Sequence, residues 1–209
     1  MKTPTSVYID GFNLYHGCVK GTPYRWLDLS KLCTMLLPGH DIKQIKYFTS
    51  LVIPTEDDPQ QLQRQLTYLR ALRTISNLEV YFGQFLTHAV WRPLAQPRPG
   101  LPAMVEVLDT KEKGSDVNLA SHLLMDGFKG AYETAVVISS DSDLVEPLRL
   151  VIGQLGLSVG VLHPHRRHSK ELSQVANFFR PIRERVLKAC QFPTTLTDSV
   201  GTITKPVGW

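Results

Sequence analysis

The segment Thr134-Ala-Val-Val-Ile-Ser-Ser-Asp-Ser-Asp143 is the most informative part of the sequence about the fold. Its apolar half is typical of a strand that is buried on both faces, as strands are in parallel sheets. Two aspartates follow at once, in a turn that opens a helix predicted over 143–155. A buried strand that leads directly into a helix is the repeating unit of α/β proteins.

The same alternation extends in both directions along the chain. Strands are predicted at 6–9, 42–50, 78–82, 104–108, 134–139 and 157–162, and helices at 11–19, 28–37, 57–75, 115–128, 143–155 and 169–179. The prolines between 87 and 103 predict a loop there. This order predicts an α/β fold, with an open, mostly parallel sheet flanked by helices in a single domain.

The bulk composition is that of an ordinary globular protein. The chain has 209 residues, of which 43% are hydrophobic and 20% charged, enough to bury a full core. It shows no leader peptide and no apolar run that could cross a bilayer. Cys18, Cys33 and Cys190 are odd in number and far apart, which favours neither a disulfide framework nor a zinc knuckle. A cytoplasmic protein without a membrane partner is expected.

The positive charge is concentrated in the last third of the chain. Between His163 and Lys188 seven Lys and Arg residues face two Glu, a balance of +5, so the rest of the +4 chain is near −1. A basic segment of this kind suits a partner that carries phosphates. A solvated helix face explains the charge equally well.

Four aspartates lie where predicted strands give way to helices. Asp10 follows the first strand, Asp141 and Asp143 follow the strand 134–139, and Asp116 begins the helix after 104–108. Ligands of open parallel sheets bind outside the carboxyl ends of the strands. Any one of these aspartates is most simply a helix cap, but four of them at three junctions are harder to explain in that way.

A cluster of these carboxylates would need a cation. Two carboxylates ~4 Å apart repel by roughly 4 kcal/mol at an effective dielectric constant near 20. A bound metal ion, or protons held at raised pKa, would relieve that repulsion. Ligands that offer only oxygen favour Mg or Mn over zinc. The residues therefore predict a Mg or Mn site, provided that the four side chains converge.

Three motifs, in order, resemble those of NYN domains, the LabA-like branch of the PIN-like nucleases. They are Val7-Tyr-Ile-Asp-Gly-Phe-Asn13, Glu112-Lys-Gly-Ser-Asp-Val-Asn-Leu-Ala120 and Val137-Ile-Ser-Ser-Asp-Ser-Asp-Leu144. The segments 156–160 and 172–178 are similar to the closing strand and helix of that family. The resemblance covers 7–179 and leaves out the loop and the end of the chain.

This resemblance implies a PIN-like, Rossmannoid domain over 1–180, followed by a basic helix and an extended tail over 181–209. It implies metal-dependent hydrolysis of RNA, with metal-binding acids at Asp10, Asp116, Asp141 and Asp143. Asn13 would orient Asp10 or a metal-bound water. Ser139 and Ser140 would line the phosphate side of the site, with help from backbone N–H groups.

Basic residues near the motifs are candidates for contact with the RNA backbone. They are Lys113, Arg166 and Arg167. The last two belong to His163-Pro-His-Arg-Arg-His168, which also resembles a metal or catalytic histidine site, although its arginines would oppose a cation. A solvated surface explains all three basic residues equally well.

Two positions depart from the family pattern. His122 stands where members often carry a further acid, and Asp126 lies one turn beyond it on the same helix face. Asn177 stands where the closing helix often has an aspartate. Neither change touches the four acids, so metal binding is still expected, with one metal or two.

The predicted function is a metal-dependent ribonuclease that acts on single-stranded RNA and leaves a 5′ phosphate and a 3′ hydroxyl. The alternative is a non-catalytic RNA-binding regulatory module with the same fold. Cleavage of DNA is a third possibility, because this chemistry does not use the 2′-OH. The loop at 87–103 would also permit a homodimer.

Overall fold

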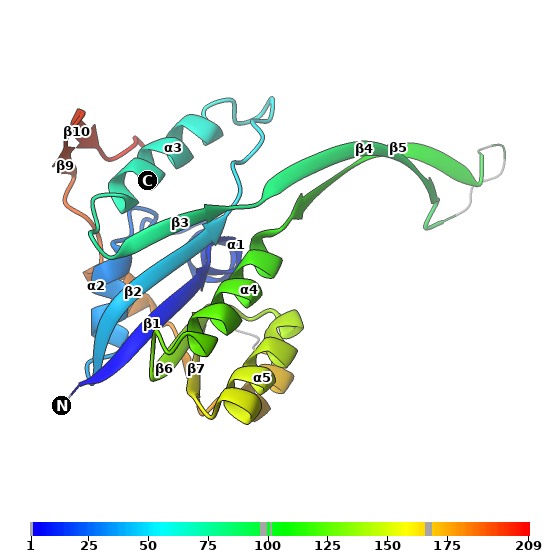
Figure 1. The fold of residues 1–209 in the computed structure, drawn as a ribbon. Helices are drawn as coiled ribbons and strands as arrows, with labels where there is room; N and C mark the ends of the chain where they lie inside the picture. Colours follow the sequence, from blue (N-terminus) through cyan, green and yellow to red (C-terminus); the bar gives the residue numbers. More distant parts are fainter. Residues whose placement is uncertain (1, 97–99, 101, 166–168) are drawn as a thin grey trace.

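Six parallel strands form the central sheet, in the order β3-β2-β1-β6-β7-β8 (Figure 1). The computed structural model describes residues 2–96, 100, 102–165 and 169–209. The strands of the sheet are β1 (Thr3–Asp10), β2 (His40–Thr49), β3 (Leu78–Phe82), β6 (Thr134–Ile138), β7 (Ser158–His163) and β8 (Phe178–Pro181). The predicted α/β fold class is confirmed.

Helices cover both faces of this sheet and bury two cores. The first face carries α1 (Gly11–Leu14), the π-helical turn η1 (Tyr15–Val19), α2 (Leu29–Leu36), α3 (Gln61–Leu72) and α7 (Glu184–Ala189). The second face carries α4 (Ser115–Phe128), the short η2 (Ser142–Leu144), α5 (Val145–Leu155) and α6 (Lys170–Val175). Side chains of β1 alternate between the cores, with Val7 and Ile9 in the first and Tyr8 in the second.

The strand order reverses between β1 and β6. From β1 the chain adds β2 and then β3 on one side, and it later places β6 on the other side of β1. The carboxyl ends of two neighbouring strands, whose connections leave in opposite directions, meet at this switch point. Ligands of open α/β sheets bind there. Asp10 and the turn after Ile138 both lie at this position.

A long two-stranded arm takes in the first part of the predicted loop. β4 (Gln84–Pro93) and β5 (Met104–Lys113) pair antiparallel and project away from the domain, on the side of the carboxyl ends of β1 to β3 (Figure 1). The prediction of a loop is therefore wrong for residues 87–93, where residues that favour strands dominate and the first proline, Pro93, ends the strand. Met104 does begin a strand, but that strand pairs with β4 and not with the central sheet.

The predicted last helix also ends early. It stops at Val175, and Phe178–Pro181 forms the edge strand β8 beside β7. Gly160 makes this pairing possible, because a Cβ at that position would lie 1.9 Å from the Phe178 ring. The sheet thus crosses the predicted boundary at residue 180.

The end of the chain folds back over the first face of the sheet. β9 (Thr195–Asp198) and β10 (Gly201–Thr204) form a hairpin, and the Arg70 guanidinium of α3 donates two hydrogen bonds of 2.6 and 2.7 Å to the Asp198 carboxylate. Trp209 packs against the rings of Trp26 and Tyr68. In the described part of the chain, no helix has both the length and the apolar character that crossing a membrane requires.

Candidate active site

Asp10 occupies the centre of the switch point. It ends β1 and caps α1, where its Oδ1 accepts a hydrogen bond of 2.9 Å from the backbone N–H of Asn13. Its Oδ2 accepts one of 3.0 Å from the Ser139 hydroxyl, and the residue is only 4% exposed. Burial raises the pKa of Asp10, the bonds from Asn13 and Ser139 lower it, and the charge of Asp141 raises it again.

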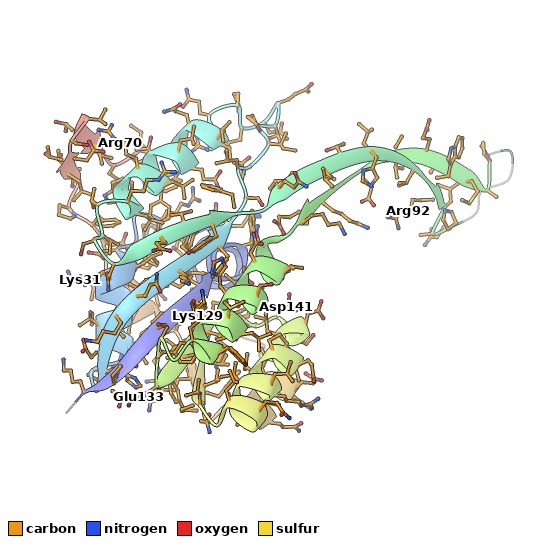
Figure 2. All side chains as sticks on the ribbon, in the orientation of Figure 1. Lys31, Arg70, Arg92, Lys129, Glu133 and Asp141 are labelled. Atoms are coloured by element: carbon orange, nitrogen blue, oxygen red, sulfur yellow. The ribbon has the colours of Figure 1, made fainter. Side chains whose placement is uncertain are left out.

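The turn after β6 is tied to the turn after β1. Asp141 donates its backbone N–H to the Ser139 hydroxyl at 3.1 Å and accepts from the Asp143 N–H at 3.0 Å. The Asn13 side chain accepts from the backbone N–H of Ser140 at 3.1 Å. Asn13 and Ser139 therefore cross-link the two turns and fix Asp10 relative to Asp141. Asp141 lies on the side of the domain from which the arm projects (Figure 2).

Asp116 reaches the same region from a different direction. It is the second residue of α4, and α4 follows the arm and not a strand of the central sheet. Partial burial, together with the neighbouring negative charges of Asp10, Asp141, Glu112 and Asp143 in decreasing order, raises the pKa of the Asp116 carboxyl to about 6. All four predicted acids are therefore close enough to influence one another electrostatically.

Glu112 is a further acid that sequence reasoning did not assign to the site. Its Oε1 accepts hydrogen bonds from the hydroxyls of Ser50 at 2.6 Å and Ser115 at 2.7 Å, which join the end of β2 to the start of α4. Gly83 makes room for this carboxylate, because a Cβ there would lie 2.2 Å from it. Glu112 thus positions the helix that carries Asp116. Its place inside the second motif was the signal that could have identified it.

The oxygen ligands that these acids offer are of the type that hard divalent cations prefer. They are carboxylate oxygens, the acids repel one another, and no lysine or arginine is recorded in an ion pair with any of the four in the described residues. Within those residues, however, no three His, Cys, Asp or Glu side chains lie close enough together to ligate one ion. The four acids share one region without forming a finished ligand set, so a metal ion could bind to three or more of them only if it drew them together.

The predicted substrate-binding residues differ in their placement. Ser139 is fully buried and uses its hydroxyl between Asp10 and Asp141, so it positions the acids and does not line an open phosphate site. The Ser140 hydroxyl is buried with no hydrogen-bond partner among the described residues. Lys113 is exposed at the base of the arm. Arg166 and Arg167 lie outside the described residues.

The two departures from the family pattern have structural roles. The Asp126 carboxylate accepts from Lys46 Nζ at 2.6 Å and from the Tyr8 hydroxyl at 2.7 Å, so it is already used in the second core and does not replace the missing acid. The His122 ring packs at a tilt against the Tyr81 ring, with 4.0 Å between their centroids, and its Nδ1 lies 3.3 Å from the same ammonium. Asn177 accepts from the backbone N–H of Val159 and holds β7 to the segment before β8.

A cavity of about 130 Å³ lies next to the site, on the first face of the sheet. Gly11 is part of its wall and lies directly after Asp10. A Cβ on Gly11 would lie 2.6 Å from the Tyr47 hydroxyl, so this glycine lets α1 pack closely on β2. Five aromatic side chains contribute to the wall, namely Phe12, Tyr15, Tyr47, Tyr68 and Trp209.

A parallel sheet with acids gathered at its switch point defines this protein as an α/β protein of the PIN-like type. The sequence profile of the NYN domain family matches residues 4–183, and the chain belongs to this family, a member of the PIN-like nuclease superfamily. The family prediction is confirmed at that level.

Individual proteins similar to the chain include a curated enzyme and a solved structure. One is 6-hydroxy-3-succinoylpyridine 3-monooxygenase HspA of Pseudomonas putida, 29% identical over 98% of this chain and 75% of its own length. The other is a crystal structure of a protein of unknown function from Vibrio parahaemolyticus, which aligns with a TM-score of 0.58 at 18% identity over 88% of this chain and 94% of its own. The second likeness concerns the fold alone.

Proposed function

We propose that this protein is a metal-dependent ribonuclease of the LabA-like branch. The observation that carries the proposal is the cross-linked pair of turns at the switch point, where Asn13 and Ser139 fix Asp10 beside Asp141. The negative charges of Asp10 and Asp141 also raise the pKa of Asp116. A protein that only binds RNA would have no use for this concentration of negative charge.

Each residue of the site has a part in this function. Asp10, Asp116, Asp141 and Asp143 are the residues that would hold Mg or Mn. A bound ion would supply the positive charge that activates water and stabilises the leaving oxygen. Asn13 and Ser139 hold Asp10 at a fixed orientation, and Glu112 holds the helix that carries Asp116. The proposed products are a 5′ phosphate and a 3′ hydroxyl.

Single-stranded RNA is the proposed partner. Lys113 is exposed at the base of the arm, close in sequence to Asp116, and offers positive charge to a phosphate backbone. The cytoplasm is the proposed location, in keeping with the free thiols of Cys18, Cys33 and Cys190. The 2′-OH plays no part in the proposed hydrolysis, so RNA preference would rest on binding contacts.

Metal dependence is the direct test of this function. End-labelled single-stranded RNA and a DNA of matched sequence are incubated with the protein in Mn, in Mg or in excess EDTA. We expect cleavage of RNA with either metal and none in EDTA, and we expect added Mn to restore it. The new ends should carry 5′ phosphates.

Four outcomes would contradict the proposal of a metal-dependent ribonuclease. Cleavage that persists in EDTA, or a 2′,3′-cyclic phosphate end, would exclude hydrolysis supported by the aspartates. RNA that binds in a filter assay but stays intact with every metal would identify the non-catalytic regulatory module. Cleavage of DNA alone would mean that the substrate is DNA and not RNA, with the same metal-dependent hydrolysis.

A second candidate function is action on a small heteroaromatic acid. The relative from Pseudomonas putida is named as a monooxygenase of a succinoylpyridine. The observation in this chain that favours such a ligand is the cavity with aromatic walls beside Asp10. Failure to cleave or bind any nucleic acid would make this candidate the stronger one.

We further propose that the arm joins two copies of the chain. Trp91 is 63% exposed and Leu108 is 78% exposed, and the register of β4 and β5 places both on one face of the ribbon. A two-stranded ribbon is marginal in water without such a partner. We expect a dimer in sedimentation velocity, and a monomer when both residues become glutamate. Gln84→Glu, on the other face, should stay dimeric, and a monomeric wild type would refute the arrangement.

A further inference from the structure

The cavity beside Asp10 has the features of a ligand site of its own. It is lined by residues of α1, η1, the end of β2 and α3, and by Trp209 at the end of the chain. Its walls combine aromatic rings with few charged groups. Buried sites for small ligands are typically built in this way, from apolar walls and a small number of polar groups that fix orientation.

The charged groups of this cavity leave a positive excess. Arg25, Asp58 and Arg64 are the charged residues of its lining, two positive and one negative, which gives +1. Arg64 is paired with Asp58. Arg25 has no recorded ion pair in the described part of the chain, and its Nε is buried without a hydrogen-bond partner there. A buried donor left unpaired in this way is destabilising by about 1–3 kcal/mol, so an anionic acceptor would be favoured.

The backbone on both sides of Arg25 is firmly held. The Trp26 indole N–H donates to the Pro193 carbonyl at 2.7 Å, and the Trp26 carbonyl accepts from the Phe192 N–H at 2.9 Å. The Tyr24 carbonyl accepts from the Gln191 side chain at 3.3 Å. The segment that carries Arg25 is therefore fixed by the returning chain before any ligand arrives, which is the preorganisation that tight binding requires.

The cavity has room for a single ring and is partly open to the surface. Its volume is about 130 Å³, close to the roughly 150 Å³ of an apolar cavity that takes up benzene. Rings on several sides suit a flat aromatic ligand. A guanidinium matches a carboxylate or phosphate through two parallel hydrogen bonds.

We infer that this cavity binds the six-membered heteroaromatic ring of a small anionic ligand, with Arg25 as the contact of its anionic group and Tyr15 and Trp209 among the walls around the ring. Two sources offer this chemistry, a pyrimidine nucleotide and a small pyridine-type acid. The site uses none of the four aspartates, so binding can be measured whether or not the protein cleaves RNA. Gly11 joins it to Asp10, which would place the bound ring next to the acids.

The test is a titration followed by tryptophan fluorescence. A Trp91→Phe background removes the distant reporter on the arm and leaves Trp209, at the cavity, with Trp26 in the core. The probes are UMP and nicotinate, each with its neutral twin, uridine and nicotinamide. We expect saturable quenching by at least one anion, and binding of its neutral twin weaker by about tenfold or more. UMP alone would identify a nucleotide site, and nicotinate alone a site for an aromatic acid.

Variants of Arg25 connect this binding to the cavity. Arg25→Gln should weaken the anion about tenfold or more and leave the neutral twin unchanged, and Arg25→Lys should recover part of the loss. Arg149→Gln, on the exposed side of α5, is the matched control and should bind as the wild type does. Circular dichroism checks that each variant is folded. The inference is overturned if neither anion binds more tightly than about 10 mM, or if a folded Arg25→Gln protein binds the anion unchanged.

Discussion

Asp141→Asn is expected to lower the rate of RNA cleavage by at least about 100-fold while the protein stays folded. Asparagine keeps the size of the side chain and an oxygen that can accept from the Asp143 N–H, as Asp141 does at 3.0 Å. What it removes is one negative charge from the acids around Asp10 and Asp116. The metal would bind more weakly, so less of the protein would carry the positive charge that stabilises the transition state.

The measurement is single-turnover cleavage of labelled RNA in Mn, with unfolding by urea recorded on the same sample. Glu146→Gln, at the exposed start of α5, removes a carboxylate charge outside the site and should leave the rate unchanged. Raising the Mn concentration should restore part of the activity of Asp141→Asn if the defect is in metal binding. A folded Asp141→Asn protein with the wild-type rate would remove Asp141 from the site.

Lys46→Met is expected to destabilise the fold by about 3–5 kcal/mol. Lys46 Nζ lies 2.6 Å from the Asp126 carboxylate, with the side chains only 6% and 13% exposed. Removing the ammonium leaves that carboxylate enclosed, with the Tyr8 hydroxyl at 2.7 Å as its remaining recorded donor. A buried charge without its partner is among the largest single destabilising changes. Urea unfolding followed by circular dichroism measures the change.

Two further variants separate the charge from the packing. Lys46→Met combined with Asp126→Asn removes both charges and keeps an oxygen for the Tyr8 hydroxyl, so it should recover most of the lost stability. Lys43→Met breaks the exposed pair with Asp41, whose side chains are 55% and 48% exposed, and should change the free energy of unfolding by less than about 1 kcal/mol. If the double variant were as unstable as the single one, lost packing of the lysine stem would be the cause.

Local patterns were enough to predict the α/β class, because the spacing of apolar residues within each strand and helix indicates its type. They failed where one residue depends on a distant partner. Phe178 enters a strand because Gly160, far away in sequence, leaves space for its ring. The arm was missed because its strands pair only with each other, and prolines in the intervening segment concealed the pairing.

The candidate acids were also visible in the sequence, since Asp10, Asp141 and Asp143 follow strands that must end on the same edge of a parallel sheet. Their cross-linking was not visible. The hydrogen bonds from Ser140 to Asn13 and from Ser139 to Asp10 form only because β1 and β6 lie side by side. Glu112 and the competing use of Asp126 were hidden for the same reason.

The alternation of strands and helices and the four candidate aspartates could be read from the sequence, because both depend on residues that are neighbours along the chain. The tertiary structure alone decided the switch point between β1 and β6, the arm and the cavity beside Asp10. These arise from contacts between residues far apart in sequence. Such contacts depend on which elements pack together, and no local pattern of side chains specifies that choice.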